Sequence, residues 1–322
     1  MMAIQVAECG GPEKLQMEEI PVPQPGPGQA LVKISNIGVN FIDIYFRTGL
    51  YKADLPFTPG MEASGLVEAV GEGVLDVTVG DRVAYAMQRG AYAEFAVVPA
   101  WQLVKIPNNV GFDLAAAAML QGMTAHYLTH STFPLAEGHT ALIHAAAGGA
   151  GQLIVQMAKM RGARVIGTVG SAAKVEQAKA AGADHVILYN EQDFAAEAKA
   201  LTGGKGVDVV YDSVGASTFQ KSLDSLRPRG MMVTFGNASG PVPAVEPLLL
   251  NAKGSLFLTR PTLAHHCADK VELNWRAGDV LGWIATGKLK VHVGGTYSLK
   301  DVGQAHIDLA SRKTTGKLLL SL

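Results

Sequence analysis

The segment with the clearest chemical meaning is a glycine-rich turn, HAAAGGAG, at residues 144–151. Gly148 lets the backbone approach a pyrophosphate, and Gly151 lets a following helix pack close to the preceding strand. The N-terminus of that helix offers N–H groups to phosphates. Ala146 occupies the first glycine position of the usual fingerprint, and similar turns also join strands to helices without binding anything. Strand, turn, helix and next strand nevertheless follow in the right order, so the pattern predicts a dinucleotide site.

The residues at the end of the next predicted strand indicate which dinucleotide is bound. Sheets that bind NAD usually carry Asp or Glu about 20 residues past the turn, to hold a ribose hydroxyl. Residues 168–174, TVGSAAK, contain no carboxylate. Ser171 and Lys174 instead supply a hydroxyl and an ammonium, which suit a 2′-phosphate. Lys174 could equally be a solvated helix lysine, but the missing carboxylate favours NADPH.

The scaffold that positions these residues is expected to have two domains, because the chain of 322 residues exceeds the ~250 residues at which a single core usually stops growing. Residues 1–122 contain short β-runs broken by glycine and proline, which predict a β-rich domain. Residues 123–260 alternate strands and helices, which predicts an α/β fold with a doubly wound parallel sheet. Its six strands are expected at residues 140–144, 164–169, 185–188, 207–211, 231–235 and 255–258. Residues 261–322 contain a helix at 267–285 and a last strand at 317–320, and are expected to return to the first domain.

Composition excludes several classes of protein. Hydrophobic residues make up 48% of the chain and charged residues 17%, which is typical of a well-buried globular enzyme. A net charge of −1 provides no basic surface for nucleic acid or an anionic membrane. The N-terminus lacks the pattern of a secretory signal, and no apolar run reaches ~18 residues, so we expect a soluble, cytoplasmic protein. Two cysteines, Cys9 and Cys267, cannot build a disulfide framework or a four-thiolate zinc site.

Six further segments, together with the glycine turn, make the chain resemble the quinone oxidoreductase branch of the medium-chain dehydrogenase/reductase superfamily, which includes zeta-crystallin. They are NFID at 40–43, RTGLY at 47–51, PGMEASG at 59–65, YDSVG at 211–215, FGN at 235–237 and TRP at 259–261. The resemblance covers nearly the whole chain. It implies a GroES-like catalytic domain, a Rossmann NADPH-binding domain, a cleft between them, and homodimers joined through sheet edges.

The same resemblance implies chemistry without zinc. Zinc-containing relatives bind a catalytic metal through Cys, His and Cys, and Asn40, Met61 and Gln121 stand at what look like those positions. Amides and a thioether are poor zinc ligands, so we expect no metal site. The histidines at residues 126–144 and 265–266 do not alter this expectation, because adjacent helical side chains diverge by about 100° and no HExxH motif occurs. The GxSxG elbow of a serine hydrolase is also missing.

Without a Lewis acid, an easily reduced acceptor is favoured. Hydride transfer to a simple aldehyde creates an alkoxide that needs a metal or strong donors, whereas a quinone or conjugated enone delocalises the charge. We therefore predict an NADPH:quinone oxidoreductase whose protons come from water or a tyrosine. An NADPH-dependent enone or alkenal reductase is the alternative. A zeta-crystallin-like RNA-binding or structural role is a third interpretation, and the absence of a basic stripe argues against RNA.

For the acceptor site we predict Asn40, Asp43, Tyr45 and Tyr51, with Arg260 at its rim. Asn40 and the tyrosines can donate to a carbonyl oxygen, Asp43 can orient its neighbours, and the rings can lie against a flat acceptor. Alternatively, the tyrosines only pack at a domain edge, and Asp43 caps a helix or pairs with Arg47. Besides Gly148, Gly151, Ser171 and Lys174, the resemblance implies cofactor contacts at Phe41, Ile42, Tyr127, Gly149, Ala150, Gly170, Tyr189, Asn237 and Arg312.

Overall fold

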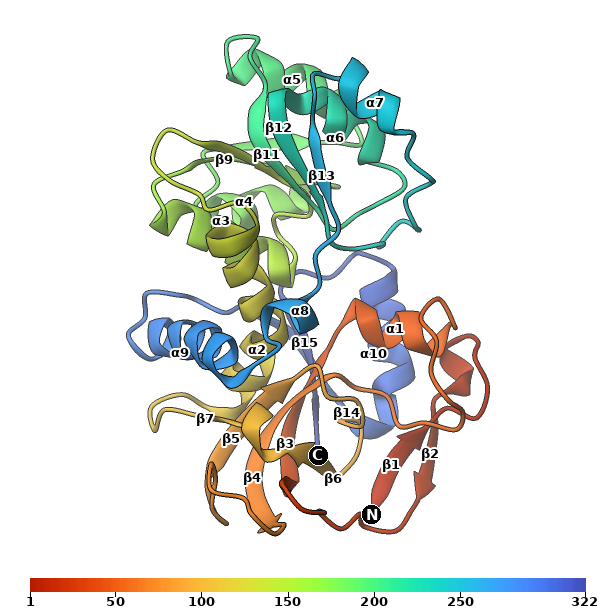
Figure 1. Cartoon of the computed structure of the whole chain (residues 1–322). Helices are drawn as coiled ribbons and strands as arrows, with labels where there is room; N and C mark the ends of the chain where they lie inside the picture. The colour runs from red at the N-terminus through yellow and green to blue at the C-terminus, as the bar shows by residue number, and fades with distance from the viewer. The chain divides into compact units, whose positions relative to one another are not determined.

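The computed structural model describes all 322 residues and divides the chain into two compact units (Figure 1). The first unit combines residues 1–123 with residues 266–322, and the second contains residues 124–265. Both ends of the chain therefore belong to the same unit. None of the helices combines the length and the apolar character needed to span a bilayer.

The first unit is built on a seven-stranded sheet in the order β14-β15-β3-β4-β5-β7, with β6 also paired to β3. Its strands are β3 (Gln29–Val39), β4 (Glu62–Val70), β5 (Arg82–Ala86), β6 (Phe95–Pro99), β7 (Val104–Lys105), β14 (Val293–Ser298) and β15 (Lys317–Ser321). A separate hairpin joins β1 (Met2–Gln5) and β2 (Gln16–Glu19). The helices are α1 (Phe41–Arg47), α2 (Phe112–Tyr127), α9 (Lys270–Ala285) and α10 (Val302–Ala310).

The last strand completes this sheet. β15 runs antiparallel to β3, with Leu318 opposite Val39 and Leu320 opposite Ile37. Because side chains alternate along a strand, Leu318 and Leu320 join the main core of the unit, while Leu319 packs against α2 at Ala116 and Ala117. The C-terminal segment therefore pairs with the sheet of the first unit.

The second unit is a six-stranded parallel sheet in the order β10-β9-β8-β11-β12-β13. Its strands are β8 (Thr140–Ile143), β9 (Arg164–Val169), β10 (His185–Leu188), β11 (Val207–Asp212), β12 (Leu226–Thr234) and β13 (Phe257–Thr259). The helices between them are α3 (Gly149–Met160), α4 (Val175–Ala180), α5 (Phe194–Leu201), α6 (Phe219–Ser225) and α7 (Pro247–Ala252), and α8 (Leu263–His266) follows β13. All six predicted strands are present, which confirms the doubly wound sheet.

Helices cover the sheet as the alternating pattern requires. α3 lies along β8 and β9, whereas α5 and α6 pack against each other and against β10, β11 and β12 (Figure 1). Phe194, Phe219 and Leu223 of α5 and α6 share a core with Leu142 and Val210 of the sheet. Strands covered on both faces are apolar throughout, which explains why these runs were visible in the sequence.

One helix begins later than predicted. The expected helix at residues 267–285 starts at Lys270, because the Asp269 side chain accepts a 2.9 Å hydrogen bond from the Glu272 N–H and ends the preceding extended backbone. Residues 263–266 form the separate short helix α8.

Candidate nucleotide and acceptor sites

The glycine turn leaves no room for a side chain at Gly151 and little at Gly148. Ala145, the first residue of the turn proper, has a positive φ of 50°, and its carbonyl oxygen lies under the start of α3. A Cβ atom on Gly151 would lie 2.1 Å from that oxygen, and one on Gly148 would lie 3.1 Å from it. Gly148 caps α3, and Gly149, Ala150 and Gly151 form its first turn, whose N–H groups have no partner within the helix. The turn therefore has the shape and polarity that a phosphate group requires.

The predicted residues after β9 and β10 lie together. A Cβ on Gly170 would approach the Tyr189 hydroxyl to 3.1 Å, and the Asn190 amide donates to the Gly170 carbonyl over 2.8 Å. Ser171 caps a short 3-10 turn that ends at Lys174, with Lys174 N–H donating to the Ser171 carbonyl over 3.1 Å. Hydroxyl and ammonium thus come from one exposed turn at the carboxyl edge of the sheet.

Asn237 and Arg260 also lie together in the second unit. Arg260 donates to the Gly236 carbonyl over 3.1 Å and to the Thr234 hydroxyl over 3.4 Å. With the Asn237 amide turned so that its nitrogen donates to the Gly236 carbonyl, its oxygen accepts from Arg260 over 3.1 Å. Arg260, predicted at the acceptor rim, is therefore tied to a residue predicted to contact the cofactor.

In the first unit, Asn40 is held in a buried polar cluster. The Asn40 oxygen accepts from the Lys317 ammonium over 2.7 Å, and its amide nitrogen donates to Glu62 over 2.8 Å and to the Gly38 carbonyl over 3.0 Å. Lys317 and Glu62 form an ion pair of 2.5 Å, with side chains 1% and 0% exposed. Glu62 also accepts from the Leu120 N–H over 2.5 Å. Both hydrogens of the Asn40 amide are thus donated within the protein.

Asp43 ends a second chain of buried hydrogen bonds. One oxygen, Oδ2, accepts from the Asn40 N–H over 2.9 Å and from the Tyr92 hydroxyl over 3.0 Å. The Tyr92 oxygen lies 2.9 Å from His306 Nε2, and Arg47 lies 3.4 Å from His306 Nδ1. Since Tyr92 donates to Asp43, His306 must donate from Nε2 to Tyr92, which leaves Nδ1 to accept from Arg47. The other Asp43 oxygen, Oδ1, is buried without a hydrogen-bond partner.

Burial controls the ionisation of the side chains in this hydrogen-bond network. It raises the pKa of Asp43 to about 7, against the lowering effects of the Asn40 N–H, the Tyr92 hydroxyl and Lys317. Burial lowers the pKa of His306 to about 3, and the positive Arg47 lowers it further. Burial and the neighbouring Asp43 raise the pKa of Tyr92. Near neutral pH the His306 imidazole is therefore uncharged, and the Asp43 carboxyl group changes between its protonated and ionised forms near pH 7.

The predicted tyrosines lie on or beside α1. The rings of Tyr45 and Tyr51 are 5.2 Å apart, and the Phe41 ring lies 6.2 Å from that of Tyr45. The Tyr51 N–H donates to the Tyr45 carbonyl over 3.0 Å, which ties the loop after α1 to the helix. Tyr45 is 8% exposed and Tyr51 is half-buried, so the cluster has both a packed and an accessible ring.

The remaining predicted cofactor residues are more scattered. Ile42 is half-buried on α1, and Arg312 is exposed after α10 with a positive φ of 57°. Tyr127, at the end of α2, is buried.

Known proteins resemble the chain over its whole length. A family model described as "Alcohol dehydrogenase GroES-like domain" matches residues 26–108, and one described as "Zinc-binding dehydrogenase" matches residues 149–267. The "Quinone oxidoreductase" of Pseudomonas aeruginosa is 44% identical over 98% of both chains. The chain belongs to the quinone oxidoreductase family of medium-chain dehydrogenases/reductases.

Two other relatives bear on the chemistry of this family. A crystal structure of Escherichia coli quinone oxidoreductase complexed with NADPH is 44% identical, with a TM-score of 0.98 and full coverage of both chains. The "2-haloacrylate reductase" of a Burkholderia species is 43% identical over 99% of this chain and 98% of its own.

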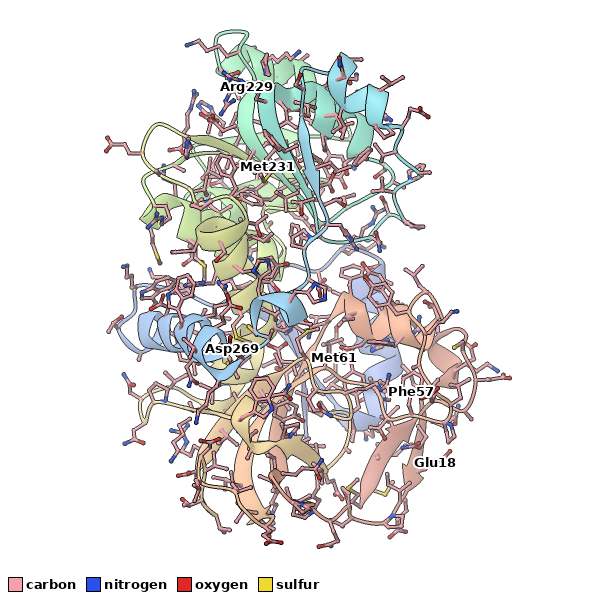
Figure 2. All side chains as sticks on the ribbon, in the orientation of Figure 1. Glu18, Phe57, Met61, Arg229, Met231 and Asp269 are labelled. Carbon is pink, nitrogen blue, oxygen red and sulfur yellow. The ribbon has the colours of Figure 1, made fainter.

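The residues of this quinone oxidoreductase family member do not fit a zinc ion, despite the description of the second family model. No group of three His, Cys, Asp or Glu side chains is placed to hold a metal. At the first of the three expected positions, the Asn40 oxygen already accepts from an ammonium. Met61, labelled in Figure 2, immediately precedes β4 and offers only a thioether, and Gln121 offers an amide.

Sequence reasoning missed four residues of this region: Glu62, Tyr92, His306 and Lys317. Glu62 and Lys317 carried little signal, because each is the first residue of an apolar strand run, and charged residues are mostly exposed. His306 lies on the buried face of α10 with Val302 and Ala305, at helical spacing. Tyr92 carried no distinguishing signal.

Proposed function

We propose that this protein is an NADPH:quinone oxidoreductase that works without zinc. The observation that carries the proposal is the glycine turn. A Cβ on Gly148 or Gly151 would crowd the Ala145 carbonyl oxygen, and because these residues have no side chain, the backbone N–H groups at the start of α3 are accessible to a phosphate. The quinone oxidoreductase relatives with the same fold support the choice of acceptor.

The second unit would hold NADPH through residues of four loops, which follow β8, β9, β10 and β12. The turn at residues 148–151 would receive the pyrophosphate, and Ser171 and Lys174 the 2′-phosphate. Gly170 and Tyr189, which lie together, would contact the adenosine end, and Asn237 the other end. When bound, NADPH supplies a hydride to the acceptor.

The first unit would hold the acceptor against α1. Tyr45 and Tyr51 present rings to a flat molecule, and a tyrosine hydroxyl or water provides the proton that accompanies the hydride. Asn40 and Asp43 are hydrogen-bonded within the protein, so they would position α1 while Tyr51, the more accessible ring, meets the acceptor.

The proposal is tested by measuring NADPH oxidation against a panel of ortho-quinones, para-quinones and enones. Gly151→Ala should abolish NADPH binding and turnover, because its Cβ would meet the Ala145 oxygen at 2.1 Å. Gly278→Ala is the matched control, since a Cβ there meets nothing within 4 Å. A folded Gly151→Ala protein with normal NADPH affinity, or a wild type that reduces no quinone, would contradict the proposal.

A second candidate, reduction of a conjugated carbon–carbon double bond, is favoured by the 2-haloacrylate reductase relative. The same panel separates the two activities. Higher kcat/KM for enones, alkenals or acrylates than for every quinone would assign the protein to alkene reduction. Moderate-salt titration against RNA tests the binding role, because phosphate-driven binding weakens steeply with salt.

We further propose that the protein is a cytoplasmic homodimer. β13 is the edge strand of the six-stranded sheet, and Phe257 on it is 57% exposed, which provides both unpaired backbone groups and apolar surface for a second copy. Light scattering should give a molar mass of two chains, and a single-chain mass at micromolar concentration would contradict the dimer. Cell fractionation tests the compartment.

A further inference from the structure

A serine, a histidine and an aspartate lie in contact inside the second unit. His144, the residue after β8, is 1% exposed, and Ser222 of α6 and Asp212 of β11 are completely buried. His144 Nε2 lies 2.9 Å from the Ser222 hydroxyl, which donates to Asp212 over 3.0 Å. The imidazole Nδ1 lies 2.7 Å from the hydroxyl of Thr168 on β9. The proposed function uses none of these four side chains.

The direction of these hydrogen bonds excludes a nucleophile. Ser222 has one hydrogen, and it is donated to the Asp212 carboxylate, so its oxygen must accept from His144 Nε2. His144 Nδ1 is then unprotonated and accepts from Thr168. In a hydrolase the imidazole accepts the serine proton, which is the reverse of this arrangement. Burial lowers the pKa of His144, in agreement with a neutral ring.

Asp212 shapes the loop after its own strand. Its Oδ1 accepts from the N–H groups of Val214 and Gly215 over 2.8 and 3.0 Å, and its Oδ2 also accepts from the Thr218 hydroxyl over 2.7 Å. With Ser222, the carboxylate receives four hydrogen bonds, which satisfy it although it is buried.

The chain Thr168–His144–Ser222–Asp212 therefore joins the carboxyl ends of β9, β8 and β11. Each end leads directly into a loop at the nucleotide edge: the glycine turn after His144, the turn at Gly170 after Thr168, and the loop at Gly215 after Asp212. Backbone contacts follow the same course, since His144 N–H donates to Tyr211 and Ala146 N–H donates to Thr168, each over 3.0 Å. The Phe194 ring of α5 packs edge-on against His144 at 4.8 Å.

We propose that His144 is a positioning residue for the coenzyme, whose neutral ring fixes the glycine turn relative to the loops after β9 and β11 through Thr168, Ser222 and Asp212. The inference rests on the proposed NADPH site. It assigns to these side chains an effect on the whole dinucleotide, through the turn that receives the pyrophosphate, and none on the choice between NADPH and NADH.

The test compares two substitutions at Thr168, of which one removes the hydroxyl and the other keeps it. Thr168→Val removes the donor to His144 Nδ1 at nearly constant shape, and Thr168→Ser retains it. Fluorescence titration measures the Kd of the protein for NADPH and for NADH. In Thr168→Val both Kd values should rise by a similar factor, roughly two- to tenfold for one lost hydrogen bond. Thr168→Ser should bind both coenzymes nearly as the wild type does.

Ser222→Ala and His144→Leu extend the test, with Ser225→Ala as control. Ser225 is also a buried serine of α6, but its hydroxyl donates only to the Lys221 carbonyl of the same helix, over 2.8 Å. Ser222→Ala should raise both Kd values, whereas Ser225→Ala should lower the melting temperature at most. The KM for the quinone should stay constant in all of them.

The outcomes separate this inference from the proposed function. Unchanged Kd values in folded Thr168→Val, or a loss confined to NADPH, would overturn the positioning role while the NADPH site stands. A wild type that binds neither coenzyme would overturn the proposed function itself.

Discussion

Lys317 on the last strand donates its ammonium hydrogen to the side-chain oxygen of Asn40 over 2.7 Å, across a sequence separation of 277 residues. Asn40 precedes α1, so the position of that helix depends on the final strand of the sheet. Glu62 supplies the counter-charge at 2.5 Å. The aromatic cluster proposed to meet the acceptor is therefore anchored by a buried ion pair.

Removing one partner of this pair should be costly. Lys317→Met leaves Glu62 as an unpaired buried charge, and should lower the free energy of unfolding by about 3–5 kcal/mol. Adding Glu62→Gln removes that charge, so the double variant should recover part of the loss. Urea denaturation of the wild type, both single variants and the double variant measures the coupling. A double variant whose loss equals the sum of the single losses would show that the two side chains do not interact.

Asp43 should make stability fall as the pH rises. Its pKa is about 7 in the folded protein against the ordinary value of 3.8, so between these pH values only the folded chain binds the proton. The stabilisation is complete below pH 3.8 and is lost as the pH rises through about 7. Asp43→Asn is neutral at every pH, and its stability relative to the wild type should increase across this window, by on the order of 4 kcal/mol. Parallel stability curves for the two proteins would refute the assignment.

The Tyr92 hydroxyl should set the position of that window. It donates to the ionised carboxylate and lowers the pKa of Asp43, so Tyr92→Phe should move the midpoint of the stability decline to higher pH. Tyr85→Phe is the matched control, because the Tyr85 hydroxyl is buried without a partner. Denaturation series at several pH values give both midpoints. A Tyr92→Phe midpoint equal to that of the control would remove Tyr92 from the network.

Tyr45→Phe and Tyr51→Phe should lower turnover on a quinone while NADPH affinity stays nearly constant. One net hydrogen bond contributes roughly 0.5–1.5 kcal/mol, which corresponds to about two- to tenfold in rate. Steady-state kinetics and coenzyme titration separate the two effects. Wild-type behaviour of both variants would support the alternative in which these rings only pack.

Lys174→Ala should change the choice of coenzyme. A charge-assisted hydrogen bond to a 2′-phosphate contributes about 1.5–3 kcal/mol, so NADPH binding should weaken by roughly 10- to 150-fold while NADH binding barely changes. Lys179→Ala is a suitable control, since Lys179 pairs with Glu176 on α4. The ratio of kcat/KM for the two coenzymes is the measurement. An unaltered ratio would make Lys174 a solvated helix residue.

Purified protein should contain well below one zinc per chain, and chelators should leave its turnover intact. The physical reason is the donor set of Asn40, Met61 and Gln121, which offers zinc neither a thiolate nor an imidazole. Elemental analysis with and without chelator measures this. Stoichiometric zinc together with chelator-sensitive turnover would contradict the expectation.

The sequence predicts the sheet of the second unit well because its strands are buried on both faces, so that Val165, Ile166 and their equivalents form continuous apolar runs. It also places residues 317–320 in a strand. The partners of Asn40 and Asp43 could not be predicted, because Lys317 and His306 reach them only through long-range strand pairing and packing. Hydrogen-bond direction was likewise invisible: the Asn40 amide is a plausible donor in the sequence, but in the structure both of its hydrogens are donated internally.

The division of the first unit between two distant segments has a consequence for synthesis on the ribosome. Glu62 emerges 255 residues before Lys317, and the edge of β3 that receives β15 stays unpaired until the last residues of the chain are made. The second unit is continuous and can complete its sheet before the last segment is translated. The nascent chain therefore carries an open, apolar strand edge and a buried-type carboxylate through most of its synthesis, a period in which mispairing with other chains competes with folding.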